Sequence, residues 1–330
     1  QIKLFQKMMN AVVLNQPGEA HELRVEDYTK PSPRSNEVLI RVKAAGVNRP
    51  DIFQRQGKYP APNGIVQDIL GLEVSGIIEE VGVGVTSWKP GAEVCALVPG
   101  GGYAEYVTVD SGSCLPIPDN ISLEDAAAIP EVLFTVWHNV FQRGQLQKGE
   151  SVLIYGGSGG IGSMAIQLCH LFGAKVYTLA STEEKVSYCY KLGADKVINY
   201  KKENLLQGIG NNSVDVILDS LGGEHLDVNL DLLRSEGRLV YINAMDGVKS
   251  SLNLMKLMVK RVQISGSTLR ARSIKFKKSL AEDILVNAYP LVGSPYFKSP
   301  VNYRFSFHQA AEAHALMESR DFVGKIILLF

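Results

Sequence analysis

The sequence has few of the features that mark a membrane, secreted or nucleic-acid-binding protein. No apolar run approaches the roughly 20 residues of a membrane-spanning helix. The first residues lack the apolar core and cleavage site of a signal peptide. Basic and acidic residues balance to a formal net charge of zero, which argues against a polyanionic partner. We therefore expect a cytoplasmic protein with no nucleic-acid or membrane partner.

Cysteine and histidine are also sparse. Four cysteines show neither metal-ligand nor disulfide spacing, so we expect small buried thiols in a reducing compartment. Six histidines are scattered, and each is interpreted as a surface or hydrogen-bonded core residue. No metal site is predicted. The cysteines are Cys95, Cys114, Cys169 and Cys189.

At 330 residues, of which 45% are hydrophobic, the chain is long enough for about two domains. Residues 1–8 are interpreted as an extension ahead of the first strand. Residues 10–120 have short strand-like runs with glycine and proline at intervals near ten residues, which predicts a compact barrel-like β domain. Residues 49–67 look like a long loop, typical of a binding loop. The expected strands are Asn10–Leu14, Glu37–Ala45, Leu70–Val81, Gly91–Leu97 and Gly102–Val109.

A glycine-rich stretch organises the second half of the chain. An apolar run, 152–155, precedes it and a helical pattern, 164–172, follows, so the glycines join a buried strand to a helix. Within it Gly157, Gly159 and Gly162 match G-x-G-x-x-G, the pattern that lets backbone and a helix N-terminus approach a pyrophosphate. A dinucleotide site is predicted. The stretch reads Gly156-Gly157-Ser158-Gly159-Gly160-Ile161-Gly162.

The end of the next strand, 175–180, bears on the choice of dinucleotide. Sites for NAD usually place an acid there, on the ribose 2′-hydroxyl. This chain has Ser181, with Lys185 one helical turn further on, which favours NADPH because a hydroxyl and a lysine suit a 2′-phosphate. Ser181 and Thr182 can also simply cap the following helix, and both readings can hold together.

Strand and helix patterns alternate from residue 150 onward, which predicts an α/β fold with a doubly wound parallel sheet. Residues 122–144 are expected to be mostly helical, interrupted at Pro130. The sixth strand, Gln263–Thr268, is expected at a sheet edge, and exposed edges invite pairing, so we expect a homodimer or higher homo-oligomer. A helix over 274–289 follows, and the last elements, 303–330, are expected to rejoin the first domain. The remaining strands are expected near 152–156, 175–180, 196–199, 214–219 and 237–243.

Seven stretches at matching spacing resemble the medium-chain dehydrogenase/reductases, and among them the zinc-free, zeta-crystallin-like quinone oxidoreductases. The resemblance spans nearly the whole chain. One departure is the turn at 157–159, which is richer in glycine than is usual for that family. The stretches are AAGVNRPDIFQRQGKYP (44–60), LGLEVSGIIEEVG (70–82), PGGGYAEYVTV (99–109), AAAIPEVLFT (126–135), GGSGGIG (156–162), KLGADKVINYKKE (191–203) and VGKIIL (323–328).

The resemblance implies a GroES-like β-barrel-type catalytic domain, residues 1–127 with 271–330, and a Rossmann NADPH-binding domain, residues 128–270. It implies that Ser181, Lys185 and Tyr200 hold the adenosine 2′-phosphate and that the turn Ser158–Ser163 holds the pyrophosphate. Asn48 and Tyr59 would face the substrate. Further implied cofactor contacts are Thr135, Met245, Gly266, Ser267, Thr268, Leu269 and Lys325.

The resemblance also implies an activity: metal-independent transfer of hydride or electrons from NADPH to a quinone. Zinc-dependent relatives carry a cysteine and a His-Glu pair at positions that here read Asn48 and Leu72-Glu73, so converging zinc ligands are missing. Two alternatives stay open: reduction of an enone or alkenal double bond, and a cofactor-binding protein with a structural or regulatory role. Asp51 is interpreted as a turn or helix-start residue. Tyr59 either hydrogen-bonds a quinone oxygen or packs as a loop aromatic.

Overall fold

The computed structural model describes residues 7–330, which separate into two compact units. The first unit contains the chain up to Glu131, then Arg270–Tyr289 and Ser299–Phe330; the second contains Val132–Leu269 and Pro290–Lys298. Most of the extension expected at residues 1–8 lies outside the described residues, and Met8 already begins the strand β1, Met8–Leu14. Lys298 belongs with the second unit because its N–H donates to Gln167 Oε1 at 2.8 Å.

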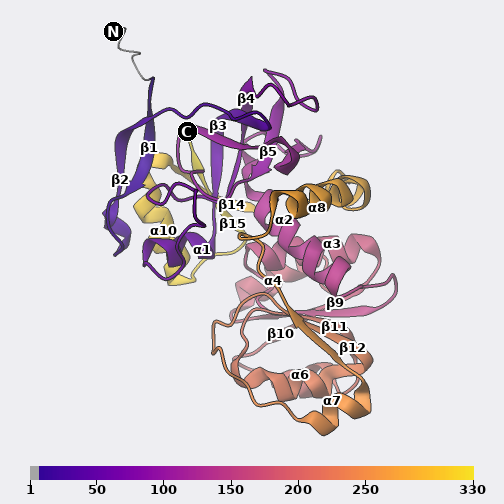
Figure 1. Ribbon diagram of the computed structural model, residues 1–330. Helices are drawn as coiled ribbons and strands as arrows, with labels where there is room; N and C mark the ends of the chain where they lie inside the picture. Colours follow the sequence, from indigo (N-terminus) through magenta and orange to yellow (C-terminus); the bar gives the residue numbers. More distant parts are fainter. Residues whose placement is uncertain (1–6) are drawn as a thin grey trace, which may run out of the picture. The chain divides into compact units, whose positions relative to one another are not determined.

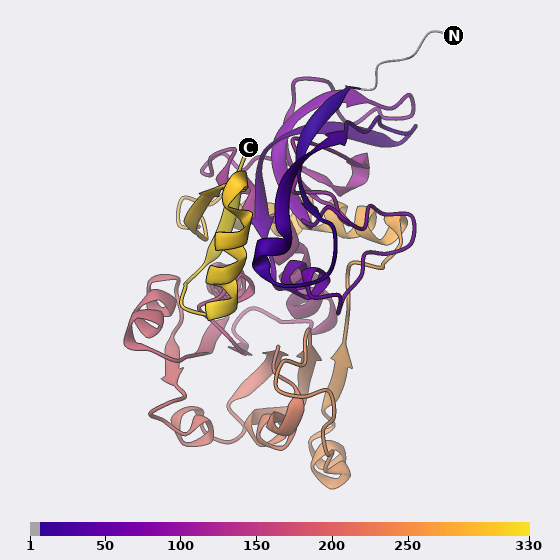
Figure 2. The same cartoon turned by 90° about the vertical axis from the view of Figure 1, so that its left-hand side faces the viewer.

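The second unit is built on a six-stranded sheet in which every pairing is parallel, in the order β10-β9-β8-β11-β12-β13. Numbered from β8, this is the order 3-2-1-4-5-6 of a doubly wound dinucleotide-binding sheet. The predicted parallel α/β fold is therefore confirmed, and β13 lies at the sheet edge (Figure 2). The strands are β8 Ser151–Ile154, β9 Lys175–Ala180, β10 Lys196–Asn199, β11 Val214–Asp219, β12 Leu233–Tyr241 and β13 Gln263–Gly266.

Helices cover both faces of this sheet, with α3 on one face and α6 and α7 on the other (Figure 1). The centre of the sheet is buried on both sides, since β8 and β11 carry fully buried apolar side chains such as Val152, Leu153 and Ile217. Such two-sided burial explains the continuous apolar runs of the sequence. The helices between its strands are α3 Gly160–Phe172, α4 Glu183–Lys191, α5 Leu205–Ile209, α6 Leu226–Leu232 and α7 Leu254–Lys260. A further short helix, α9 Tyr289–Val292, begins at the last residue of a first-unit segment and continues into the second unit.

The segment that leads into the second unit is helical, as expected, but Pro130 begins a helix instead of interrupting one. A 3-10 turn, Asp125–Ala128, precedes α2, Pro130–Val136, and a π-helix, Trp137–Arg143, follows it. Proline suits the first turn of a helix because the N–H it lacks has no helical acceptor there.

The first unit contains a seven-stranded sheet in which β14-β15-β3-β4-β5-β7 are neighbours in that order and β6 also pairs with β3. The C-terminal strand β15 pairs antiparallel with β3, so the end of the chain does rejoin this unit. A separate hairpin joins β1 to β2. The strands are β1 Met8–Leu14, β2 Leu23–Thr29, β3 Glu37–Val47, β4 Glu73–Val81, β5 Glu93–Leu97, β6 Tyr106–Asp110, β7 Cys114–Pro116, β14 Val301–Ser306 and β15 Lys325–Leu329.

The expected loop at 49–67 is partly wrong, because it contains the helix α1, Arg49–Arg55. Asn48 caps this helix, and the Asp51 carboxylate accepts a hydrogen bond from the Asn48 N–H at 2.8 Å, completing a capping box. The other helices of the first unit are α8, Ile274–Asn287, and α10, Ala310–Ser319. Within residues 7–330, no helix has both the length and the apolar character needed to cross a bilayer.

Candidate functional site

The parallel sheet brings most of the predicted cofactor residues to one edge. The strand order reverses at β8, and ligands of such sheets bind beyond the carboxyl ends of the strands at this switch point. Five of the six strands lead at that end into a predicted cofactor segment: Gly157–Gly162 after β8, Ser181 after β9, Tyr200 after β10, Met245 after β12 and Gly266–Leu269 after β13.

Each glycine of the turn is required for a different physical reason. A Cβ at Gly157 would lie 2.1 Å from Thr178 Oγ1, and one at Gly162 would lie 2.2 Å from the Gly156 carbonyl oxygen. Both positions are therefore closed to any side chain. A Cβ at Gly159 would meet nothing closer than 3.7 Å, so this glycine leaves open space beside the turn. The positive φ of the turn, 74°, belongs to Gly156.

Helix α3 begins directly after this open space, with Gly159 as its N-cap. The N–H groups of its first turn precede the helical hydrogen-bond ladder and carry the positive end of the helix dipole. Ser163 closes the turn, since its Oγ donates to the Gly159 carbonyl oxygen at 2.7 Å. Uncapped amides beside a side-chain-free position suit the oxygens of a pyrophosphate.

Ser181 and Tyr200 lie on neighbouring strand ends, because the Tyr200 N–H donates to the carbonyl oxygen of Ala180 at 3.2 Å. Thr182, and not Ser181, caps α4 by accepting from the Lys185 N–H at 3.3 Å. The Glu183 carboxylate accepts from Lys202 Nζ at 2.7 Å. Its charge is therefore paired with a lysine.

Thr135 and Ser267 are brought together by Asn139, which the sequence did not single out. Asn139 Nδ2 donates to the Thr135 carbonyl oxygen at 2.8 Å, and Ser267 Oγ donates to Asn139 Oδ1 at 2.7 Å. Asn139 is 2% exposed, so the contact fixes the segment after β13 against the helical segment before β8. Met245 and Thr268 are exposed, and Leu269 is half-buried.

In the first unit, Asn48 lies in a buried polar cluster with Glu73 and Lys325. Asn48 Nδ2 donates to Glu73 Oε1 at 2.9 Å, and Lys325 Nζ donates to Asn48 Oδ1 at 2.6 Å and to Glu73 Oε1 at 2.5 Å. Side-chain exposure is 0% for Glu73 and 3% for Lys325, so this ion pair is shielded from water. Glu73 was detectable as the one acid in the mostly apolar stretch 70–78 of the expected strand.

A second buried chain of contacts begins at Asp51. Tyr103 OH donates to Asp51 Oδ2 at 3.2 Å and lies 3.1 Å from His314 Nε2. Burial raises the pKa of Asp51 to about 6, against the opposing effects of the Asn48 N–H and the charges of Arg270 and Lys325. Burial lowers the pKa of His314 to about 3, with the Arg55 charge as the second cause. The helix-start role predicted for Asp51 is confirmed.

Tyr59 is half-buried in the loop after α1, against Arg270. The Arg270 guanidinium carbon lies 5.4 Å from the centroid of the Tyr59 ring, and Arg270 Nη2 donates to Gln54 Oε1 at 2.6 Å. Arg270 is 9% exposed, and burial lowers its pKa. The ring of Tyr59 therefore packs on a cation, a contact that the sequence could not reveal.

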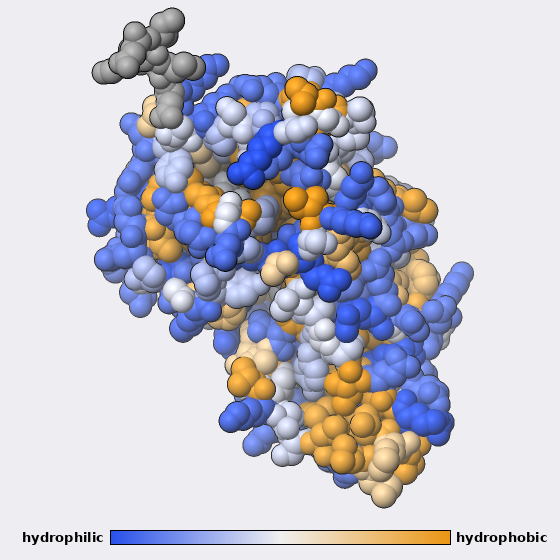
Figure 3. Space-filling model, viewed as in Figure 1, coloured by the Kyte–Doolittle hydropathy of each residue, from blue (hydrophilic) through white to orange (hydrophobic). Residues whose placement is uncertain are grey.

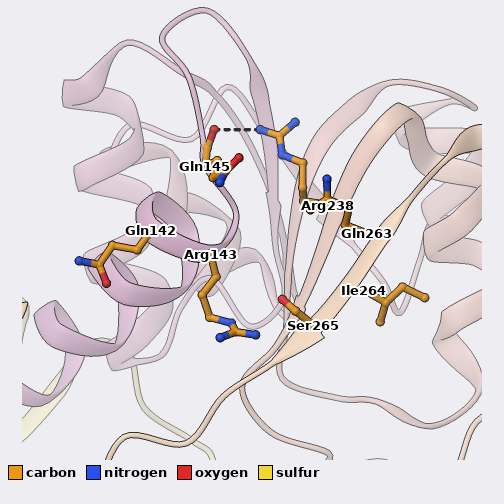
Figure 4. A pocket seen from close by; sticks show the side chains of 7 residues that line it. All are labelled: Gln142, Arg143, Gln145, Arg238, Gln263, Ile264 and Ser265. Carbon is orange, nitrogen blue, oxygen red and sulfur yellow. Dashed lines mark hydrogen bonds between the residues drawn. The ribbon is translucent and has the colours of Figure 1, made fainter. Parts of the chain in front are cut away.

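A cavity of about 360 Å³ lies elsewhere in the second unit, between the π-helix and the edge strand β13. In Figure 4 the Arg238 guanidinium bonds to the Gln145 carbonyl oxygen, while Arg143 and Ser265 line the cavity from opposite sides. It includes none of the predicted site residues. Nor do histidine, cysteine, aspartate and glutamate form any group of three or more that could hold a metal ion among residues 7–330.

The six-stranded parallel sheet with a glycine-rich turn at its switch point, joined to a separate β-sheet unit, is the architecture of a dinucleotide-binding protein. Two family models match the chain: an alcohol dehydrogenase GroES-like domain at residues 34–119 and a zinc-binding dehydrogenase domain at residues 160–284. The quinone oxidoreductase of Rattus norvegicus is 30% identical over 331 residues, which is 98% of each chain. The chain belongs to the medium-chain dehydrogenase/reductase family.

Solved structures of this family include proteins with different cofactors. A mycobacterial protein complexed with NADPH has a TM-score of 0.84 and 27% identity, covering 98% of this chain and all of that one. An NAD-dependent alcohol dehydrogenase has a TM-score of 0.84 and 30% identity, with the same coverage. The fold alone therefore leaves the choice of cofactor to the residues of the site.

Proposed function

We propose that this protein is an NADPH-dependent quinone oxidoreductase, which transfers hydride or electrons from NADPH to a small-molecule quinone. The observation that carries the proposal is the end of β9. Ser181 stands there in place of an acid, beside Tyr200 and one turn from Lys185, at the edge of the sheet where dinucleotides bind.

The residues present fit NADPH. The open position at Gly159 and the first turn of α3 suit the pyrophosphate, and Ser181, Lys185 and Tyr200 suit the 2′-phosphate. Thr135, Met245 and Gly266–Leu269 would line the nicotinamide half, which supplies a hydride at C4. A quinone takes that hydride readily, so this chain has mainly to bind and orient the reactants.

The test compares NADPH with NADH by calorimetric titration. Lys185→Ala should weaken the binding of NADPH by about 1.5–3 kcal/mol, the range of a charge-assisted hydrogen bond, and leave the binding of NADH nearly unchanged. Ser181→Asp should reverse the preference toward NADH. Lys191→Ala, on the last turn of the same helix, is the matched control and should change neither affinity. Equal losses for both cofactors in Lys185→Ala would contradict the assignment.

We also propose that the reaction needs no metal, although one matching family model is described as a zinc-binding dehydrogenase. The relatives' ligand positions read Asn48 and Leu72-Glu73 here, and the apolar Leu72 offers a metal no ligand atom. Asn48 and Glu73 are both engaged by the Lys325 ammonium, which disfavours a second cation between them. Activity should survive strong chelation, and elemental analysis should find no stoichiometric zinc. One zinc per chain, lost together with activity, would refute this.

Two neutral groups would orient the substrate, Asn48 through its amide and Tyr59 through its phenol. Neither is expected to transfer a proton in the slow step: an amide does not titrate, and Tyr59 is assigned only a hydrogen bond to the substrate. The reduced oxygens of a quinone can take their protons from solvent. The substrate site therefore works without a strong acid.

A second copy of this chain would pair with the edge strand β13. Next to this strand, α7 exposes Leu254, Met255, Met258 and Val259, each at about 60%, and Figure 3 shows the apolar surface at this end of the second unit. An unpaired edge beside exposed apolar side chains favours association. The four free, buried cysteines fit a reducing compartment such as the cytosol.

A further inference from the structure

Lys325 lies on β15 with its ammonium inside the first unit, 2% exposed as a residue. Its Nζ donates to Asn48 Oδ1 at 2.6 Å, to Glu73 Oε1 at 2.5 Å and to the Val47 carbonyl oxygen at 3.3 Å. An ammonium has three N–H groups, so each has an acceptor in the protein. Lys325 is therefore committed to these contacts within the protein, whereas the family resemblance implies a contact with the cofactor.

The chemistry of these partners fixes the orientation of the Asn48 amide. Lys325 can only donate and the Glu73 carboxylate can only accept, so Oδ1 faces Lys325 and Nδ2 faces Glu73. Among the described residues, the next acceptor of Nδ2 is the Gly46 carbonyl oxygen at 3.5 Å, the outer limit of a hydrogen bond. In this part of the chain, one N–H of the Asn48 amide therefore has only this long hydrogen bond.

Glu73 is itself held rigidly. Its Oε2 accepts from the Glu131 N–H at 2.9 Å, and its Oε1 lies where a Cβ at Gly46 would be only 2.1 Å away. Gly46 therefore leaves the space that the carboxylate fills. Because Lys325 bonds to the amide oxygen of Asn48, it also draws electron density from the amide and strengthens its N–H groups as donors.

We propose, resting on the quinone reductase function above, that Lys325 is a positioning residue. With Glu73 it sets the Asn48 amide so that one polarised N–H is presented to the oxygen of the electrophile that accepts the hydride. Lys325 then acts on the substrate only through Asn48 and makes no contact of its own with the cofactor.

The test uses Lys325→Met, Asn48→Ala, both together, and Lys148→Met as a control at an exposed lysine. Three quantities are measured: the NADPH Kd by fluorescence titration, kcat and KM with 1,4-benzoquinone, and the side-chain amide signals of Asn48 in asparagine-labelled protein. Lys325→Met should leave the NADPH Kd within about threefold and shift the Asn48 signals. Its kcat/KM should fall about 2- to 13-fold, the scale of one hydrogen bond. The double variant should be no worse than the poorer single one.

Lys325→Met alone leaves the Glu73 charge buried without its partner and can fail to fold. Lys325→Met combined with Glu73→Gln removes both charges, and it should fold and show the same shifted Asn48 signals. A tenfold or larger rise in the NADPH Kd, with unshifted Asn48 signals, would overturn the proposal. So would losses in kcat/KM that multiply in the double variant. If wild type reduces no quinone, the proposed function fails, while the Asn48 signals and the NADPH Kd still decide whether Lys325 sets the amide.

Discussion

Replacing His314 with glutamine should change how the stability of the protein depends on pH. His314 is fully buried on α10, and burial lowers its pKa to about 3 from an ordinary value of 6.5. Between these values the unfolded chain binds a proton that the folded chain does not. The unfolding free energy of wild type therefore falls as pH drops through this window. Above pH 6.5 His314 is neutral in both states, so no stability is lost through this residue.

Asp51 affects stability in the opposite direction, because its pKa in the folded protein is raised from 3.8 to about 6. The folded chain binds this proton first, so the contribution of Asp51 to stability grows as pH falls from about 6 toward 4. At about 1.4 kcal/mol per pH unit, acidification to about pH 4.5 removes about 2.7 kcal/mol through His314 and adds about 2 kcal/mol through Asp51. In wild type these two effects nearly cancel.

The measurement is urea-induced unfolding of wild type and His314→Gln at a series of pH values. Glutamine keeps an N–H for the Tyr103 oxygen but does not titrate. On acidification from about pH 7 to 4.5 the variant should gain about 2.7 kcal/mol relative to wild type, whatever the constant cost of the substitution. A difference between the two proteins that stays constant with pH would refute the reasoning.

Three further predictions concern the turn, the substrate loop and the edge strand. Gly162→Ala should destabilise the protein by about 1–3 kcal/mol in urea unfolding, since its Cβ would lie 2.2 Å from a backbone oxygen. Tyr59→Phe should lower kcat/KM for a quinone about tenfold or less without changing the pH profile near neutrality. Complete loss, together with a vanished titration limb, would instead make Tyr59 the acid. Ile264→Lys, on the edge strand, should shift light-scattering mass toward a monomer, and an unchanged mass would argue against pairing through β13.

Much of the second unit could be predicted from the sequence because its signals are local. The run before Gly156 and the helix stopped by Gly173 lie within one βαβ segment, and Gly173 adopts the left-handed conformation that ends α3. The spacing of glycines and apolar residues was therefore enough to predict this βαβ segment. Where two local signals competed, the interpretation failed: Pro50 and Gly57 suggested a loop, although Asn48 and Asp51 already formed the pattern of a capped helix.

The buried contacts of the first unit could not be predicted in the same way. Lys325 meets Asn48 across 277 positions of sequence, and His314 meets Tyr103 across 211. Neither periodicity nor spacing shows which side chains, far apart in the sequence, contact each other in the protein interior. The sequence could only mark Glu73 and Lys325 as charged residues within apolar strands, a sign that each needs a buried partner.

The central claim is tested most directly by steady-state NADPH oxidation with a quinone and an enone as acceptors, using wild type and Gly159→Ala. The alanine has room within the fold, since its nearest neighbour would be 3.7 Å away, but its methyl group occupies the space expected for the pyrophosphate. We predict quinone-dependent oxidation that favours NADPH over NADH and the quinone over the enone. Gly159→Ala should keep its folding stability and lose NADPH affinity. Tight NADPH binding without turnover of any quinone, or faster reduction of the enone, would contradict the account.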